Sequence, residues 1–195
     1  MSLKEFLERT PAHGAGGSYN LTGTDGIDDV LQGGGGSRVY GHGGNDILTG
    51  GGNDTLYGGA GDDWLTGGGK DTLYGGDGDD TLIAQGGGNR LTGGAGHDVF
   101  RLETSLDQLA DGSVQPDVIT DFTPGEDRIE LNKSLFARLC TGPLSGFDSD
   151  LVQYKATTGA LLYNLDGGAS GATIHFATLS NKPKDVDPGD LFAVA

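Results

Sequence analysis

Cysteine and basic side chains are scarce in this chain. Cys140 is its single cysteine, so no disulfide can form within it. Lys and Arg total 12 against 28 Asp and Glu, for a formal net charge of −16. That surplus argues against nucleic acid or an anionic membrane as a partner, and no apolar run is long enough to span a bilayer. A surplus of negative charge instead suggests that the protein binds cations.

A secretory signal peptide is also missing from the start. Residues 1–10 carry Lys4, Glu5, Glu8 and Arg9 and have no apolar core. We therefore assign residues 1–13 to a short helix that caps the next segment of the chain, or to a leader.

Glycine, by contrast, makes up 39 of the 195 residues and is concentrated in a nine-residue repeat. One clear copy is Gly58-Gly59-Ala60-Gly61-Asp62-Asp63-Trp64-Leu65-Thr66, and residues 75–83 form another. Each consists of a glycine-rich loop, an Asp and a short apolar segment, a pattern typical of calcium-binding parallel β-solenoids. Nine tandem copies cover residues 23–101, and a degenerate tenth precedes them at 14–22.

The spacing of the repeat predicts its geometry. Positions 1 to 6 form a turn, in which glycine tolerates left-handed backbone, and positions 7 to 9 form a short strand. Because side chains alternate along a strand, position 8 points inward. The residues at position 8 are Val30, Val39, Leu48, Leu56, Leu65, Leu73, Leu82, Leu91 and Phe100. We predict an all-β fold, a parallel β-roll in which nonapeptide repeats stack into a two-sheet solenoid over residues 14–101.

The acidic turns predict the ligand. Stacked carboxylates repel one another unless a cation lies between them, and Ca²⁺ prefers carboxylate and carbonyl oxygens. Calcium is then part of the fold.

The two edges of the roll differ in their acidic residues. Copies beginning at residues 23, 41, 58, 75 and 93 (the odd copies) carry Asp28, Asp46, Asp63, Asp80 and Asp98 at position 6. Copies beginning at 32, 50, 67 and 84 (the even copies) carry Ser37, Asp54, Asp71 and Asn89, and they contain all the Lys and Arg of residues 23–100. We expect about four calcium ions between successive odd loops, and at most a weaker site at Asp54 and Asp71.

The outward faces of the two predicted sheets also differ. The even copies present Arg38, Tyr40, Tyr57, Tyr74 and Arg90, a row that could bind a polysaccharide. An aromatic cross-strand ladder is the simpler interpretation, and we favour it. The odd copies present Ile47, Trp64 and other apolar residues, which we expect another segment to cover.

After residue 101 the repeats stop, and residues 102–195 predict a β-rich cap. Expected strands lie at residues 118–122, 128–131, 151–155, 161–165 and 173–176, with a helix around 133–139 and a turn at Gly142-Pro143.

The repeats resemble RTX (repeats-in-toxin) β-rolls. Asp117-Val118-Ile119-Thr120-Asp121-Phe122 and Gly125-Glu126-Asp127-Arg128-Ile129-Glu130-Leu131 resemble the segment after the roll in serralysin-type secreted proteins. Asp190-Leu191-Phe192-Ala193-Val194-Ala195 is similar to that family's uncleaved export signal. The resemblance implies signal-peptide-independent export through a bacterial type I (ABC) transporter and calcium-driven folding outside the cell.

The resemblance also implies backbone ligands at positions 2 and 4 of the odd loops. Those carbonyls belong to Thr24, Gly26, His42, Gly44, Gly59, Gly61, Gly76, Gly78, Gly94 and Gly96.

Motifs for catalysis are missing. The sequence has no Gly-x-Ser-x-Gly elbow and no His-Glu-x-x-His zinc motif. We therefore expect a non-enzymatic, secreted calcium-binding module, either alone or as the tail of a larger enzyme. The alternative is an extracellular polysaccharide-binding or adhesion module, similar to the accessory modules of alginate epimerases.

Overall fold

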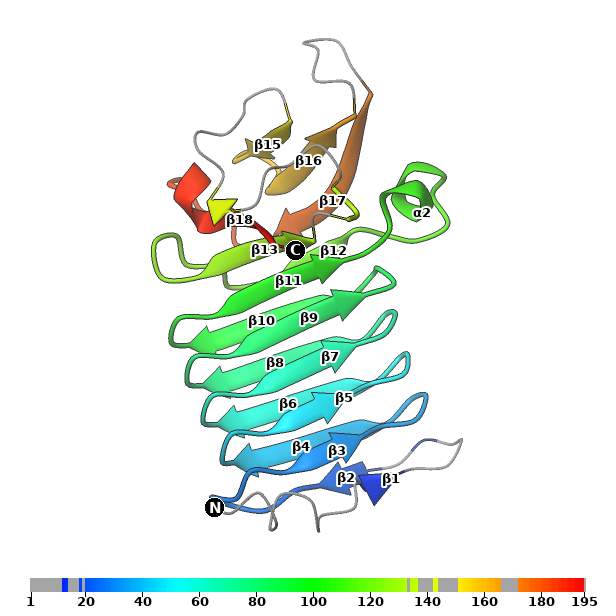
Figure 1. Ribbon diagram of the computed structural model, residues 1–195, viewed down its shortest axis with the longest axis vertical. Helices are drawn as coiled ribbons and strands as arrows, with labels where there is room; N and C mark the ends of the chain where they lie inside the picture. Colours follow the sequence, from blue (N-terminus) through cyan, green and yellow to red (C-terminus); the bar gives the residue numbers. More distant parts are fainter. Residues whose placement is uncertain are drawn as a thin grey trace.

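A computed structural model describes residues 12–13, 18, 20–132, 134–136, 142–143, 151–165 and 172–194. Two nine-stranded sheets face each other along the whole stack (Figure 1). The all-β parallel roll predicted from the repeat is confirmed. None of the described helices is long and apolar enough to cross a bilayer.

We call the sheet that contains the strands of the odd copies the odd sheet. Its strands, in spatial order, are β1 (Ala12–His13), β3 (Val30–Gln32), β5 (Ile47–Thr49), β7 (Trp64–Gly67), β9 (Thr81–Gln85), β11 (Val99–Glu103), β13 (Arg128–Asn132), β18 (Leu191–Val194) and β14 (Gly142–Pro143). All neighbours in this sheet pair parallel, except the antiparallel pair β14 and β18.

The opposite sheet, the even sheet, ends in an antiparallel meander at the cap. Its strands are β15 (Val152–Lys155), β16 (Ala160–Asn164), β17 (Thr173–Leu179), β12 (Asp117–Ile119), β10 (Arg90–Ala95), β8 (Thr72–Asp77), β6 (Thr55–Ala60), β4 (Arg38–Gly43) and β2 (Asn20–Thr22). The described residues also form the helix α2 (Leu106–Ala110) and the 3-10 turn η1 (Pro188–Asp190).

Apolar ladders fill the space between the sheets. Leu48, Leu65, Leu82 and Phe100 follow one another in register in the odd sheet, and each is fully buried. Val39, Leu56, Leu73 and Leu91 do the same in the even sheet. Position 8 therefore points inward, as the alternation of a strand requires.

The first copy deviates by one residue. Leu31, and not the predicted Val30, pairs with Leu48 and is buried. The reason is an extra residue in the first loop: Gly23 and Asp29 take the places that Gly41 and Asp46 take one coil later.

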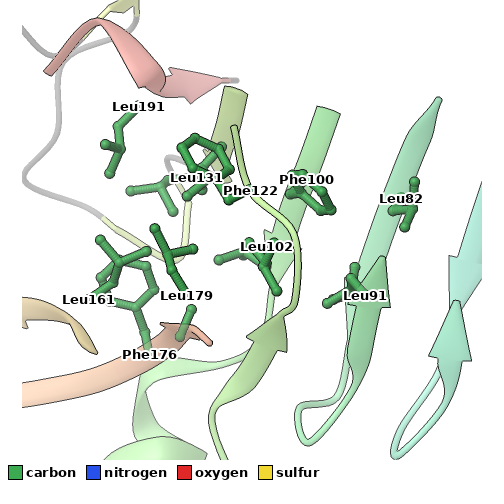
Figure 2. Packing of buried hydrophobic residues seen from close by; sticks show 14 of the residues in the cluster. Leu82, Leu91, Phe100, Leu102, Phe122, Leu131, Leu161, Phe176, Leu179 and Leu191 are labelled. Carbon is green, nitrogen blue, oxygen red and sulfur yellow. The ribbon is translucent and has the colours of Figure 1, made fainter. Parts of the chain in front are cut away.

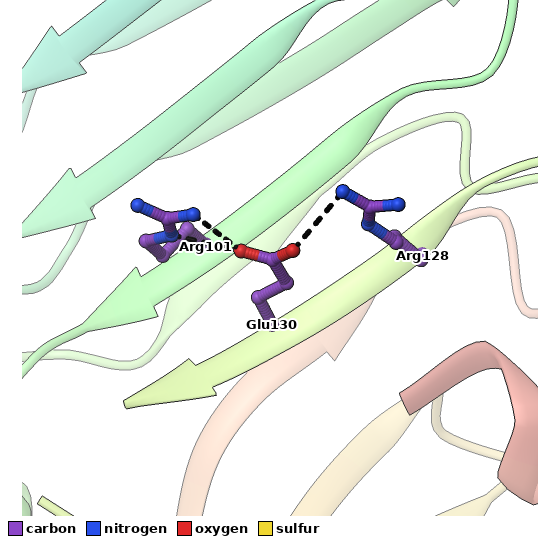
Figure 3. Close-up of polar contacts among 3 residues, drawn as sticks. All are labelled: Arg101, Arg128 and Glu130. Carbon is purple, nitrogen blue, oxygen red and sulfur yellow. Dashed lines mark hydrogen bonds and ion pairs between the residues drawn. The ribbon is translucent and has the colours of Figure 1, made fainter. Parts of the chain in front are cut away.

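Parallel pairing continues past Arg101, the predicted end of the repeats. β11 pairs with β13, and β10 pairs with β12, so both ladders run on into Ile129 and Ile119. Glu130 on β13 binds Arg101 of β11 at 2.6 Å and Arg128 at 3.2 Å (Figure 3). This ion-pair cluster joins the last repeat strand to the cap.

The predicted cap strands are found, with ends shifted by up to three residues. Gly142-Pro143 is a strand and not a turn, because it pairs with β18. Residues 134–136 form a turn in which the amides of Leu135 and Phe136 donate to the Asn132 carbonyl. The rest of the helix expected around 133–139 lies outside the described residues. The helix α2 had no counterpart in the sequence prediction.

The outward face of the odd sheet is only partly covered. Ile83 is 6% exposed, whereas Ile47 and Trp64 remain 39% and 42% exposed. The Arg101 guanidinium lies 5.6 Å from the centre of the Trp64 ring and makes a cation–π contact with it. The expected cover over Ile47 and Trp64 is therefore not found among the described residues.

Candidate metal centre

The Asp residues at position 6 form one column along each edge of the roll. Oδ1 of each carboxylate accepts a hydrogen bond from the position-6 amide of the preceding coil. In the odd column, Asp46 N donates to Asp63, Asp63 N to Asp80 and Asp80 N to Asp98, at 2.8 to 3.0 Å. In the even column, Asp54 N donates to Asp71, and Asp71 N donates to Asn89. These hydrogen bonds align the position-6 residues of successive coils along each edge.

The odd column begins at Asp29 and not at the predicted Asp28. Asp29 N donates to Asp46 Oδ1 at 2.7 Å, which places Asp29 at position 6. Asp28 instead accepts the Asn45 amide in an outer row that continues through Asp62 and Asp79. The extra residue of the first loop causes this shift.

The two edges differ in the hydrogen bonds that the second carboxylate oxygen, Oδ2, of the position-6 Asp accepts. In the even loops it is satisfied by the backbone: Asp54 Oδ2 accepts the Gly51 amide at 2.7 Å, and Asp71 Oδ2 accepts the Gly68 amide at 2.7 Å. In the odd loops, Asp63 Oδ2 and Asp80 Oδ2 are buried and accept no hydrogen bond from any described residue. A buried acceptor without a donor is costly, so these oxygens fit a bound cation.

The odd loops also bring other oxygens to the same place. A Cβ built on Gly58 would lie 2.2 Å from Asp63 Oδ2 and 2.6 Å from the Gly75 carbonyl oxygen. A Cβ built on Gly75 would lie 2.1 Å from Asp80 Oδ2 and 2.6 Å from the Gly93 carbonyl oxygen. Glycine at position 1 therefore leaves room for a carboxylate beside a carbonyl of the next coil.

Positions 2 and 4 line the edge with carbonyls. A Cβ on Gly76 would lie 2.0 Å from the Gly59 carbonyl oxygen, and one on Gly78 would lie 2.3 Å from that of Gly61. The φ angles of Gly44, Gly59, Gly61, Gly76, Gly78, Gly94 and Gly96 lie between 114° and 134°. His42 holds position 2 of its loop with a φ of 78°. These carbonyls thus stack in rows between successive odd loops.

The first odd loop is different. Thr24 donates from its amide and from its hydroxyl to Asp29 Oδ2, at 2.7 and 3.0 Å. Gly26 has a φ of 71°, unlike the glycines of the later loops, and no atom lies within 4 Å of its Cβ position. The carbonyls predicted as ligands at Thr24 and Gly26 therefore belong to a loop whose carboxylate is already hydrogen-bonded.

Burial and mutual repulsion act on the odd carboxylates. Burial, with repulsion from the charges of Asp63, Asp98 and Asp62, raises the pKa of Asp80 to about 8. Burial, with repulsion from Asp46 and Asp62, raises the pKa of Asp63 to about 6. Without a cation, these groups resist ionisation in the folded protein.

Backbone oxygens would supply most of the ligands. No three His, Cys, Asp or Glu side chains converge on one point in the described ranges. One carboxylate per loop with several carbonyls suits Ca²⁺, which takes six to eight oxygen ligands, and does not suit zinc, which prefers His and Cys.

Both columns extend into the cap, where the sequence analysis did not place them. Asn89 N donates to Asp117 Oδ1, and Asp98 N donates to Asp127 Oδ1. Asp127 Oδ2 accepts the Thr123 amide at 2.7 Å, so this carboxylate resembles that of Asp29. The signal was present in the sequence: Asp117-Val118-Ile119 and Asp127-Arg128-Ile129 repeat the Asp-x-aliphatic triplet of the roll.

The tyrosines of the even sheet form a stacked ladder. The ring centres of Tyr40 and Tyr57 lie 4.9 Å apart, and those of Tyr57 and Tyr74 lie 5.0 Å apart, with interplanar angles of 2° and 7°. Arg38 and Arg90 are exposed and share one row, with Thr55 and Thr72 between them. The ring faces turn toward one another, which matches the favoured interpretation of a cross-strand ladder.

Comparison with known proteins gives three findings. The family of RTX calcium-binding nonapeptide repeats matches residues 40–69, 49–82 and 65–100. No curated protein sequence matches the chain significantly. Among solved structures, the AlgE6R3 subunit of the Azotobacter vinelandii mannuronan C5-epimerase is similar at 22% identity and a TM-score of 0.45, over 94% of this chain and 82% of that chain. Residues 40–100 therefore match RTX calcium-binding nonapeptide repeats, and they form the central coils of the β-roll.

Proposed function

We propose that this chain is a module that folds when extracellular calcium fills its odd edge, and that it supports type I secretion of itself or of a larger protein. The observation that carries the calcium part is the pair of buried oxygens, Asp63 Oδ2 and Asp80 Oδ2, which accept no hydrogen bond from the described residues. Calcium would satisfy both and neutralise the repulsion along the column.

The proposed stoichiometry is about four ions. Three full sites lie between the successive loops that hold Asp46, Asp63, Asp80 and Asp98. A fourth, between the loops of Asp29 and Asp46, is weaker, because Asp29 Oδ2 already accepts two hydrogen bonds from Thr24. Asp54 and Asp71 bind calcium weakly at most, since their own loop amides occupy Oδ2.

Calcium concentration can act as the switch. With extracellular-type affinities of about 10⁻⁴ to 10⁻³ M and about 1 mM calcium, each site adds about 0.4–1.4 kcal/mol by mass action. Four sites add about 2–6 kcal/mol, comparable to the stability of a small domain. At cytosolic calcium the gain is close to zero, so the chain stays loosely folded and can pass through a transporter.

A calcium titration followed by circular dichroism tests the switch. We expect little β signal in chelator and a cooperative rise as calcium reaches the range of about 0.1–1 mM. Calorimetry on the same protein gives the number of ions. A chain that is already rigid in chelator would refute the calcium-dependent fold.

Secretion is tested separately, by expressing the chain in bacteria with and without a type I transporter. Support comes from the resemblance of residues 117–131 and 190–195 to serralysin-type proteins and from the calcium dependence argued above. We expect export to the medium only with the transporter, and loss of export when residues 190–195 are deleted.

No catalytic step is assigned to the paired carboxylates of the odd loops. Asp63 and Asp80 belong to the proposed ion column, and the carboxylates of Asp62 and Asp79 accept hydrogen bonds from backbone amides.

Polysaccharide binding on the even sheet is the second candidate. Arg38 and Arg90 lie in one row about 14 Å apart, at roughly 4.8 Å per strand, which suits an extended anionic chain. The stacked tyrosines offer ring edges and hydroxyls to such a ligand, not ring faces. A glycan array with the unchanged chain and with Tyr57→Ala tests this candidate, and uniform absence of binding would remove it.

A further inference from the structure

The loop of residues 84–89 differs in backbone shape from the two even loops that precede it. It joins β9 to β10, whose Leu82 and Leu91 side chains are fully buried in the core that Figure 2 shows. The two strands therefore hold both ends of the loop. Between them, residues 86–88 are three successive glycines with φ angles of 76° to 77°. Turns of this kind gather backbone N–H groups into concave sites that bind anions.

In the two preceding even loops, the Asp at position 6 accepts amides of its own loop. Asp54 Oδ2 accepts the Gly51 and Gly52 amides at 2.7 and 3.2 Å, and Asp71 Oδ2 accepts the Gly68 amide at 2.7 Å. A carboxylate oxygen therefore satisfies the glycine amides of both loops.

Asn89, at position 6 of the loop 84–89, does not take this role. Its Oδ1 accepts the Asp71 amide at 2.9 Å. Its Nδ2 donates to the Gln85 carbonyl and to Asp117 Oδ1, both at 3.0 Å. Because the second side-chain atom is a donor, Asn89 offers no second oxygen to the glycine amides of its own loop.

The next coil does not supply the acceptors either. One coil earlier, Lys70 N donates to the Gly87 carbonyl of the following loop at 3.3 Å. After the loop 84–89, the place of the next even loop is taken by residues 104–116, which contain α2. Among the described residues, none accepts a hydrogen bond from the amides of residues 86–88. Gly87 is buried, and a buried amide without an acceptor is costly.

A pocket with a basic side chain lies beside these amides. Gly86 and Gly87 line a pocket of about 250 Å³ together with Lys70 and residues 113–115. A Cβ built on Gly88 would lie 3.4 Å from Lys70 Cγ, so the lysine side chain runs along the loop. Lys70 is exposed, and the ion pairs among the described residues do not involve it. Its ammonium group is therefore free to meet an anion.

We propose that this pocket binds a small oxyanion, a carboxylate or a sulfate-type group, through the amides of residues 86–88 and the Lys70 ammonium. The ligand supplies the acceptor oxygens that Asp54 and Asp71 supply in their own loops. Gln115, which also lines the pocket, adds a neutral side-chain donor. The site lies on the edge of the even loops and uses none of the proposed calcium ligands of the odd loops.

Amide chemical shifts of the calcium-loaded chain test the site. Sodium acetate and sodium sulfate are titrated separately at constant ionic strength, at concentrations that keep calcium in solution, and the backbone amides are followed by NMR. We expect saturable shifts of the amides of residues 86–88. The Gly51 and Gly68 amides are the internal control and should not move, because each already has a carboxylate acceptor.

Two substitutions test the assigned roles. Lys70→Gln should weaken anion binding about two- to fivefold, the effect of one exposed ion pair. Lys155→Gln, at an exposed lysine of β15, should leave the binding unchanged. Asn89→Asp gives the loop a second carboxylate oxygen of its own and should abolish the binding. Circular dichroism in calcium verifies that each variant is folded.

The outcomes are distinct. Shifts caused by acetate alone identify a carboxylate ligand, shifts caused by sulfate alone identify a tetrahedral one, and shifts caused by both identify a site for either. Shifts that do not saturate, that are equally large at Gly51 and Gly68, or that persist unchanged in both Lys70→Gln and Asn89→Asp would overturn the site. Each of these results leaves the calcium titration, and with it the proposed function, unaffected.

Discussion

Single carboxylate oxygens distinguish the two edges of the roll at the residue scale. Asp71 and Asp80 hold the same position in their repeats, and both bond through Oδ1 to a neighbouring coil. Asp71 Oδ2 accepts its own loop's Gly68 amide, and Asp80 Oδ2 accepts none from the described residues. The loop backbone, and not the identity of the acidic residue, determines which carboxylate is left for a cation.

Asp80→Asn should therefore have opposite effects with and without calcium. Asn is tolerated in such a column, since Asn89 holds the equivalent even position. In chelator the variant should show a stronger β signal than the unsubstituted chain, because no charge is buried, and circular dichroism measures this. In calcium it should lose about 1–3 kcal/mol, the contribution of the two adjoining sites, and urea unfolding measures that loss.

Asp71→Asn is the matched control for that experiment. It loses the bond from Gly68 in both conditions, so its destabilisation should not depend on calcium. Equal calcium responses of the two variants would contradict the assignment of the sites to the odd edge.

Gly76→Ala should be far more disruptive than Gly69→Ala. A methyl group on Gly76, at a φ of 134°, would lie 2.0 Å from the Gly59 carbonyl oxygen, whereas nothing lies within 4 Å of the Cβ position on Gly69. We expect Gly76→Ala to cost more than about 1–3 kcal/mol of strain and Gly69→Ala less than about 1 kcal/mol. Thermal unfolding in calcium compares them, and equal melting temperatures would disprove the close carbonyl row.

At the scale of elements, β11 and β13 form the junction between the repeats and the cap. Glu130 is 5% exposed and receives both Arg101 and Arg128 across these strands. Arg101 also lies over Trp64, and Arg128 lies 6.0 Å from the centre of the Phe192 ring of β18. One carboxylate therefore orients two arginines along the outer face of the odd sheet (Figure 3).

Glu130→Gln should weaken this junction in a calcium-independent way. The substitution removes the negative charge that both guanidinium groups share, and a charge-assisted hydrogen bond is worth about 1.5–3 kcal/mol. We expect a loss of that order in the free energy of unfolding, equal in chelator and in saturating calcium wherever the fold is populated. Glu126→Gln, which removes an exposed carboxylate from the neighbouring loop, serves as the control.

The molecule as a whole stacks negative charge along one edge, and the pH dependence of its stability should reflect that charge. In the calcium-free protein, burial and repulsion raise the pKa of Asp63 and Asp98 to about 6 and that of Asp80 to about 8. A carboxyl whose folded pKa is raised stabilises the fold below its unfolded pKa of about 3.9, and that stability is lost as the pH rises through the folded pKa.

Acid should therefore partly replace calcium. In chelator, the β signal in circular dichroism should be stronger near pH 5 than near pH 8. In saturating calcium, the urea midpoint should instead be higher near pH 8, because the ion requires ionised carboxylates. Asp80→Asn should reduce the difference seen in chelator. A β signal in chelator that strengthens as the pH rises would contradict the buried, repelling column.

The sequence by itself determined the roll, the inward ladder and the position-6 columns. A strict nine-residue period places every copy in the same register, so local pattern and stacked geometry agree. The same pattern separated odd from even copies. Position 6 is Asp in the odd copies, as at Asp63 and Asp80, whereas two even copies have Ser37 and Asn89 there.

Only the tertiary structure decided where the column begins, how it ends and what encloses it. The extra residue that moves Asp28 out of the column and Asp29 into it becomes visible once coil is stacked on coil. Asp127 and Leu191 join the roll through contacts made with strands distant in sequence. The repeat could not predict these contacts. Pairing between strands distant in sequence depends on which strand edge is still unpaired after the repeats have stacked, and a nine-residue period carries no information about that edge.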